Sequence, residues 1–353
     1  MSRASTHFVG EKTNHVALHV PVLPSLDERS LHDEFRAKSS AQVSDLATLA
    51  EAPHEGDVAA LQFVGAGDAL LLLSASSAGG VRVFRVRDEE RPALEVVSSP
   101  QWETLFRGYG ATGLDAVEGC SSVVSVSGGG VIAWLSLDEQ MSVTTIGTSR
   151  SAPGSQLRIW DIAANNQFPV AVASEYAAFT PGLGDPKSGA ALTAVETHPT
   201  RPELLVTGAD DGRVCLWDRR RLDAPFRTET RHARADYSPD NAGVAAVRAV
   251  KLHAASPRFL FSAGDDAVVR RWDFHHERRD RDAVEYERRS SAGLALSTAN
   301  GFGGHGDDGL RVETVAKSDL PWNALAVHAE SDTVVAGSDA QSVVLIQNAS
   351  KRE

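Results

Sequence analysis

The sequence predicts an all-β fold built by repeating one small unit of strands, and three observations lead to this prediction. Stretches of alternating apolar and polar residues recur along the chain, which is typical of strands with one buried face. The two clearest stretches each follow an Asp-Asp pair, and Gly212 after the first pair suits a tight hairpin turn. The chain has 353 residues, of which 42% are hydrophobic, so it can bury a sizeable core without disulfides or metals.

The repeated unit is clearest at residues 204–218, which read LLVTGADDGRVCLWD, and at residues 260–273, which read LFSAGDDAVVRRWD. A shorter copy, LRIWD, occupies residues 157–161, and weaker copies end at Phe84, Trp134 and Ile346. A strand that closes on Trp-Asp after such a turn is the signature of the WD repeat, in which each blade has four strands. The sequence therefore predicts a single WD40-type β-propeller over residues 1–353.

Polar residues at fixed places in a WD blade form a buried hydrogen-bonded set: an entry His, a turn Asp, a strand Ser or Thr, and the Trp. Burial of such groups is tolerable only because each one satisfies another. The blade that ends at Trp272 is the only one with an obvious candidate for every position. The motif residues predicted from the sequence are His54, Trp160, Asp161, Asp211, Trp217, Asp218, His232, Ser262, Asp266, Trp272 and Asp273.

The spacing of the strand ends predicts seven blades, two of them degenerate, with six blades as the alternative. Residues 25–52 are expected to form a degenerate first blade or a loop, because they contain no Trp-Asp end. Residues 141–160 have room for only about two of the four strands of a fourth blade. Few residues follow Ile346, so we expect the N-terminal segment 1–12 to close the last blade through a strand at residues 6–11.

An insertion is expected before the last blade, at residues 275–320. Its first part is rich in both Arg and acidic residues, so its net charge is close to zero and a nucleic-acid patch is not expected. Its second part is rich in Gly and contains Gly301, Gly303 and Gly306 in a G-x-G-x-x-G pattern. That pattern binds dinucleotides only between a strand and a helix, and no helix is expected here.

Composition and motifs predict a protein without catalytic, cofactor-binding or metal-binding residues. Cys215 alternates within a strand and is expected to be a buried thiol, and no nucleophile or metal motif occurs. The net charge of −12 argues against direct binding of nucleic acid. The sequence contains no apolar stretch of membrane-spanning length, so no membrane insertion is expected, and no small-molecule ligand is predicted.

A second hypothesis starts from Trp217, Asp218 and Arg220, which fit a Trp-Asp-x-Arg box. Many propellers that dock on the adaptor of the cullin-four ubiquitin ligase carry this box. Arg220 would then be a surface anchor, and the protein would be a WD-repeat substrate receptor of that ligase.

Longer segments resemble the nucleoporin-forty-three family of small WD-repeat proteins, which belong to the Y-shaped scaffold complex of the nuclear pore. These segments are FVGEKTNHVALHVPVLP at 8–24, HEGDVAALQF at 54–63, LRIWDI at 157–162, THPTRPELLVTGADDGRVCLWD at 197–218, FLFSAGDDAVVRRWD at 259–273 and WNALAVHAESDTVVAGSDAQSVVLIQN at 322–348. The N-terminal and last segments are the more specific ones. Two features depart from the family pattern: residues 25–52 lack a Trp-bearing strand, and about two strands are missing before Trp160.

The resemblance implies a scaffold subunit that is not an enzyme, located at the nuclear envelope in the nuclear pore complex. Its implied partners are other nucleoporins, chiefly a helical-solenoid subunit in the short arm of the Y complex. Its implied role is a platform for protein–protein interactions that supports transport of proteins and mRNA between nucleus and cytoplasm. The interface residues are not implied.

Overall fold

The structure is a computed structural model, and it is described here for most of the 353 residues. The described residues are 14–22, 45–87, 92–106, 108–117, 121–138, 141–148, 156–159, 171–174, 190–222, 224–233, 243–274, 310–340 and 342–351. They form strands with very little helix, which confirms the predicted all-β class.

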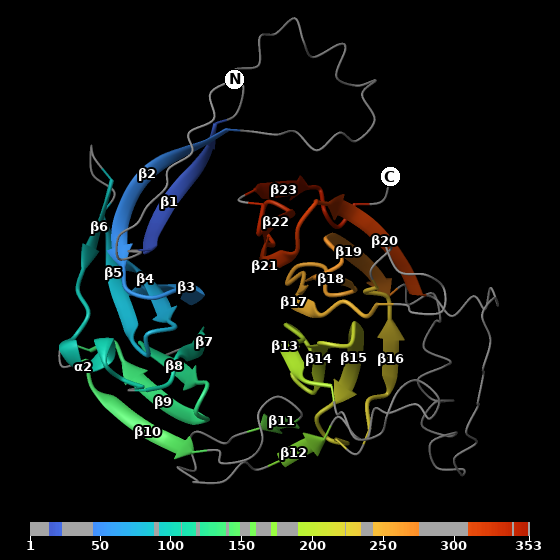
Figure 1. Ribbon diagram of the computed structural model, residues 1–353, viewed down its shortest axis with the longest axis horizontal. Coiled ribbons are helices and arrows are strands. Elements are labelled where there is room, and N and C mark those ends of the chain that lie inside the picture. Colours follow the sequence, from blue (N-terminus) through green and yellow to red (C-terminus); the bar gives the residue numbers. More distant parts are fainter. Residues whose placement is uncertain are drawn as a thin grey trace, which may run out of the picture. The chain divides into compact units, whose positions relative to one another are not determined.

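The chain is divided into two compact units. The first unit comprises residues 1–153 and 158–172. Its strands form antiparallel sheets whose neighbours follow chain order (Figure 1). One sheet pairs β1 (Asn14–Val22) with β2 (Asp45–His54). The next two sheets have four strands each: β3 (Val58–Ala66), β4 (Ala69–Ser76), β5 (Val81–Arg87) and β6 (Ala93–Val96), then β7 (Ala111–Ala116), β8 (Ser122–Ser127), β9 (Val131–Ser136) and β10 (Val143–Thr148).

The second unit comprises residues 154–157 and 173–353 and contains three larger sheets. Two have four strands: β13 (Leu192–Thr197), β14 (Leu204–Ala209), β15 (Arg213–Asp218) and β16 (Arg227–Thr230), then β17 (Val247–Leu252), β18 (Phe259–Gly264), β19 (Val268–Phe274) and β20 (Leu310–Lys317). The third has β21 (Trp322–His328), β22 (Thr333–Ser338) and β23 (Val343–Gln347). A short sheet of β11 (Gln156–Ile159) and β12 (Ala171–Ser174) contains the residues at which the chain passes between units.

The same strand register recurs in the five larger sheets, which explains why the repeats fold alike. In each sheet one apolar residue of the third strand lies opposite an apolar residue of the second strand, in the half of the ladder that is farther from the turn between these strands. These pairs are Phe84 with Leu72, Leu135 with Val123, Trp217 with Leu205, Trp272 with Leu260 and Ile346 with Val334. Only two of the five positions hold the Trp that makes the repeat visible in the sequence.

Two expectations are wrong in detail. The weaker copy was expected to end at Trp134, but Leu135 takes the buried position and Trp134 is only partly buried, because the strand register is offset by one residue. The insertion was expected to span 275–320, but residues 310–317 form β20, which pairs with β19 as the fourth strand of its sheet. The alternating sequence Leu-Arg-Val-Glu-Thr-Val of this strand was visible, but its partner was not.

Several predictions fall on residues outside the described ranges. These are the closing strand at 6–11, the motif residues Trp160 and Asp161, and the insertion at 275–309. The described residues form seven sheets, of which five have three or four strands and two have only two strands. Seven complete blades and closure by the N-terminus therefore stay predictions.

Apolar side chains between neighbouring sheets make the cores of the two units. In the first unit, Trp102 of the short helix α2 (Pro100–Glu103) is fully buried, and its indole Nε1 donates to the carbonyl of Met141 at 2.8 Å. In the second unit, Trp322 is fully buried and donates to the carbonyl of Ala267 at 3.0 Å. Both indoles lie outside the WD motif, and each ties a segment near one sheet to a turn of another.

Gly212 lies in the turn between β14 and β15, and its backbone requires glycine for two reasons. Its φ of 80° is unfavourable for residues with a side chain, and an added Cβ would lie 2.2 Å from the carbonyl oxygen of His232. We expect Gly212→Ala to lower the free energy of unfolding by about 2 to 4 kcal/mol, through backbone strain and overpacking together. Chemical denaturation of the variant and of the wild type measures this loss.

Gly67 provides the matched control, because its φ is 59° but no atom lies within 4 Å of an added Cβ. Gly67→Ala therefore carries only the backbone cost of about 1 kcal/mol. Equal losses for the two variants would contradict the close approach of the His232 carbonyl to Gly212.

Candidate functional site

A chain of buried hydrogen bonds joins the strands and turns of the sheet β17–β20. The indole Nε1 of Trp272 donates to Ser262 Oγ at 2.7 Å, and this hydroxyl lies 2.7 Å from His232 Nε2. His232 Nδ1 lies 2.9 Å from Asp266 Oδ1. The tautomer with the proton on Nδ1 satisfies these four side chains, because Ser262 then donates to Nε2 and the imidazole donates to Asp266. Arg270 Nη1 also lies 3.0 Å from Nδ1, and in this tautomer it donates to Asp266 instead. The four side chains fix the entry loop, the turn and two strands in one register.

The charges around this set favour a neutral imidazole and an ionised carboxylate. Burial lowers the pKa of His232 below its usual value, more than the bond to Asp266 raises it, and Arg270 lowers it further. Burial acts to raise the pKa of Asp266, but His232 and Arg270 outweigh burial and the pKa lies below its usual value. Arg270 also donates to Asp266 Oδ2, so the buried negative charge is paired with the guanidinium.

The sheet β13–β16 contains only part of the same set. Trp217 Nε1 donates to Thr207 Oγ1 at 2.9 Å, and both side chains are buried. Asp211, the predicted turn carboxylate, forms an ion pair with Arg213 instead. Thr207 is a motif residue that the sequence analysis did not single out, although its place ten residues before Trp217 matches that of Ser262 before Trp272.

In the sheet β3–β6, Phe84 replaces the Trp and two polar groups lose their partners. His54 is buried at the end of β2, and its Nδ1 lies 3.0 Å from the carbonyl of Gly56. His54 Nε2 and Ser74 Oγ are buried and have no hydrogen-bond partner among the described residues. Burial also lowers the pKa of His54. Both groups therefore carry a desolvation cost that the Trp272 sheet avoids.

A second set of histidines lies at the opposite end of the sheets, where the first strand of each sheet turns into the second. His198, His253 and His328 each accept, through Nδ1, a hydrogen bond from the backbone N–H three residues later. The donor–acceptor distances are 3.1, 3.0 and 3.3 Å, and the donors are Arg201, Ser256 and Ser331. The sequence analysis missed this set, although each His stands directly before the turn and begins the pattern His-x-x-Arg or His-x-x-Ser.

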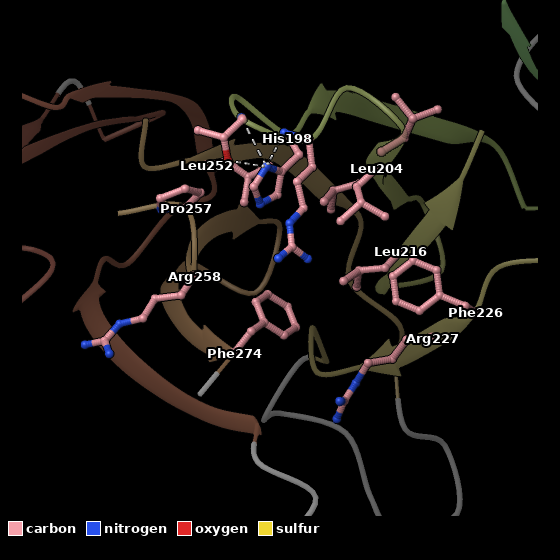
Figure 2. A pocket seen from close by; sticks show the side chains of 13 residues that line it. His198, Leu204, Leu216, Phe226, Arg227, Leu252, Pro257, Arg258 and Phe274 are labelled. Carbon is pink, nitrogen blue, oxygen red and sulfur yellow. Dashed lines mark hydrogen bonds between the residues drawn. The ribbon is translucent and has the colours of Figure 1, made fainter. Parts of the chain in front are cut away.

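A groove of about 340 Å³ opens at this end, between the sheets β13–β16 and β17–β20. Figure 2 shows the rings of Phe226 and Phe274 on two sides of the opening, with Leu216 close to Phe226. His198 and Leu252 lie near each other, on a side of the groove away from Phe226. The thirteen lining residues are His198, Thr200, Arg201, Leu204, Leu205, Val206, Leu216, Phe226, Arg227, Leu252, Pro257, Arg258 and Phe274. Most are apolar, three are arginines and none is acidic.

The Trp-Asp-x-Arg box begins in β15 of the same sheet. Asp218 accepts hydrogen bonds from the Arg220 guanidinium at 2.6 to 3.1 Å, and the Arg220 side chain is 69% exposed. The side-chain hydrogen bond from Arg220 holds the pKa of Asp218 below its usual value. Asp273, the equivalent carboxylate in the next sheet, is buried and lies 3.7 Å from Arg258 Nε. Both motif aspartates therefore neutralise arginines at this end of the sheets.

Within the described part of the chain, no group of three or more His, Cys, Asp or Glu residues is placed to hold a metal ion. Cys215 is buried, and its sulfur lies 3.6 Å from Thr228 Oγ1, which makes it a packing residue of β15. No helix among these residues is long and apolar enough to cross a membrane.

Comparison with known proteins agrees with the repeated sheets. The family model described as WD domain, G-beta repeat, matches residues 186–218, which include β13, β14 and β15. Mouse nucleoporin Nup43 is 24% identical over an alignment of 332 residues, and this alignment covers 84% of this chain and 80% of the mouse protein. The human nucleoporin Nup43 is 24% identical over 338 residues, covering 85% of this chain and 82% of the human protein.

The chain resembles nucleoporin Nup43 over most of its length. The family resemblance expected from the sequence is thereby confirmed, and so is the WD40 β-propeller class. Similarity to the Nup43 proteins covers more than four-fifths of the chain, so it includes sheets in which the Trp-Asp signature has been lost.

The two serines of the buried sets allow a direct test of hydrogen-bond pairing. Ser262→Ala removes the partner of the Trp272 indole Nε1 and of His232 Nε2, so we expect the free energy of unfolding to fall by about 1 to 3 kcal/mol. Ser74→Ala removes a buried hydroxyl that has no partner among the described residues, so we expect no loss or a small gain in stability. Denaturant unfolding of both variants measures the difference, and losses of the same size would contradict it.

The lowered pKa of the buried His232 predicts how the stability of the protein depends on pH. Because folding lowers the pKa of His232, the unfolded chain takes up a proton near pH 6.5 while the folded chain does not. The stabilisation is present above about pH 6.5 and is lost as the pH falls below it, toward the folded pKa. His54 and His198 act in the same direction. We expect the melting temperature to fall between pH 7 and pH 5, and His232→Gln to reduce this fall. An unchanged slope in the variant would contradict the neutral buried imidazole.

Proposed function

We propose that the protein is a structural scaffold subunit of the nuclear pore complex, in the short arm of its Y-shaped complex. The observation that carries the proposal is the similarity to nucleoporin Nup43, which extends over about 84% of the chain and is not confined to one WD repeat. A single shared repeat would support only a common blade. Similarity that also includes sheets without the Trp-Asp signature supports a common molecule with a common role.

The physical basis of this role is rigid display of surfaces. The sheets are held by buried hydrogen bonds and by apolar cores between neighbours, so the loops and strand ends at each edge keep fixed positions. Specificity in such a protein comes from a few buried anchors within a large interface. We infer a protein that is not an enzyme, that binds other nucleoporins, chiefly a helical-solenoid subunit, and that supports transport of proteins and mRNA at the nuclear envelope.

We also infer that the seven sheets are the blades of one propeller. The sheets follow one another in chain order, and the five larger ones share one register. The last sheet has three strands in the described part of the chain, and a strand at residues 6–11 would supply the fourth. The sheets β1–β2 and β11–β12 would be the degenerate first and fourth blades.

A substrate receptor of the cullin-four ubiquitin ligase is the alternative function. The exposed Arg220 side chain favours it, because an anchor for an adaptor has to reach the surface. The pairing with Asp218 weighs against it, because this carboxylate already occupies the guanidinium. Both relatives compared above are nucleoporins, and this similarity favours the scaffold role over the ligase role.

Affinity purification of the tagged full chain from its own cells, followed by mass spectrometry, tests the proposal. We expect recovery of Y-complex nucleoporins in amounts comparable to the bait, and we expect Arg220→Glu to leave this recovery unchanged. Recovery of the cullin-four adaptor without nucleoporins, abolished by Arg220→Glu, would instead establish the ligase hypothesis. Recovery of neither would remove the support for both functions and leave only the fold.

A further inference from the structure

Two neighbouring junctions between sheets differ at one position in a way that points to a missing partner. At the junction of β17–β20 with β21–β23, Asp332 directly precedes the second strand, and its Oδ1 lies 3.1 Å from His253 Nε2. At the junction of β13–β16 with β17–β20, the residue directly preceding the second strand is Arg258. The first junction has an internal carboxylate, and the second has a cation in its place.

The imidazole of the second junction is consequently left with a free donor. His198 Nδ1 accepts from the backbone N–H groups of Thr200 and Arg201 at 3.3 and 3.1 Å, so the proton of the neutral ring lies on Nε2. Nε2 has no hydrogen-bond partner among the described residues, and His198 lines the groove. Figure 2 shows the guanidinium of Arg258 pointing away from His198, toward the outer edge.

The charge around the groove favours an acidic occupant. Arg201 is exposed and has no ion pair within the described part of the chain, whereas Arg227 pairs with Glu229 at 3.0 Å. Arg258 stacks on the Phe259 ring at 4.5 Å and lies 3.7 Å from Asp273. The thirteen lining residues include no carboxylate, although the whole chain has a net charge of −12. Among the lining arginines, Arg201 is therefore the cation that an anionic segment can pair with, beside the Nε2–H of His198.

The apolar walls add a second requirement. Phe226 is 50% exposed at the mouth, and Phe274, Leu216 and Leu252 line the interior. An exposed aromatic ring beside an apolar groove is typical of an anchor for a large apolar side chain. A free anion such as phosphate would leave these apolar walls in contact with water. The occupant therefore carries both an anionic group and a large apolar group.

We propose that this groove binds an acidic peptide segment of a partner protein, in which an Asp or Glu stands next to a large apolar residue. The carboxylate of the peptide accepts a hydrogen bond from His198 Nε2, as Asp332 accepts one from His253 at the neighbouring junction. The same carboxylate forms an ion pair with Arg201. The apolar side chain packs between Phe226 and Phe274. The inference does not rest on the nuclear-pore proposal, since it follows from the groove alone.

The test uses the full chain and a fluorescein-labelled ten-residue peptide in which Asp alternates with Leu and Phe. Fluorescence anisotropy measures its dissociation constant, and a second peptide carries Asn in place of every Asp. We expect the Asp peptide to bind at least about tenfold more tightly than the Asn peptide, because charge-assisted hydrogen bonds are lost in the latter. We expect binding of the Asp peptide to weaken as salt is raised. Equal affinities would overturn the proposal.

Four variants locate the binding site on the surface. We expect Arg201→Gln and Phe226→Ala each to weaken binding of the Asp peptide by about tenfold. Arg219→Gln is the matched control for charge, because Arg219 is exposed and lies outside the lining. Phe63→Ala is the matched control for the ring, because Phe63 is 51% exposed on β3 of the first unit. Losses of the same size in the controls would overturn the proposal, and melting curves verify that all four variants fold.

Sedimentation of the chain without peptide distinguishes a partner from a second copy. We expect a monomer whose sedimentation is unaffected by Arg201→Gln. A dimer that dissociates in this variant, together with no binding of the Asp peptide, would show that a second copy occupies the groove and would overturn the proposal. The readout is peptide binding, so failure here leaves recovery of nucleoporins as an independent test of the pore function.

Discussion

The register of the third strand against the second is the constraint on which the regular part of this molecule depends, and in two sheets a hydrogen bond from an indole to a strand hydroxyl fixes it. This hydrogen bond is made only when the third strand of a sheet stands in one register against the second, as with Trp272 and Ser262 at 2.7 Å. A slip of one residue would turn the whole apolar face of the strand outward. Adding His232 and Asp266 extends this control from the two strands to the entry loop and the turn.

Sheets that have lost this set hold the same register by packing alone. Phe84, Leu135 and Ile346 occupy the position of the Trp and lie opposite apolar residues of the second strand. Shape and apolar area suffice for register, because a shifted strand would expose these side chains. The polar set therefore adds specificity where it is complete, and it leaves a cost where it is partial, as at His54 and Ser74.

The replacement of the motif Trp by other apolar residues explains how much of the fold could be predicted from the sequence. The WD copies ending at Trp217 and Trp272 were recognisable because the Trp, the turn and the alternation coincide. The strand ending near Trp134 was placed one residue too early, because a visible Trp outweighed the less conspicuous Leu135 that is buried. The strand at 310–317 was assigned to an insertion, because its pairing with β19 spans a long interval that no local pattern reveals.

The groove lay beyond prediction for a different physical reason. Local signals fix strands and turns, but the groove results from which residue a turn places against the neighbouring sheet. Asp332 and Arg258 occupy corresponding places before their strands, and only the packing of adjacent sheets brings one to His253 and leaves the other beside an open cavity. A propeller repeats its framework of strands and varies the residues at the junctions between sheets. These residues determine where neighbouring sheets satisfy each other's polar groups and where a polar group stays available for a partner.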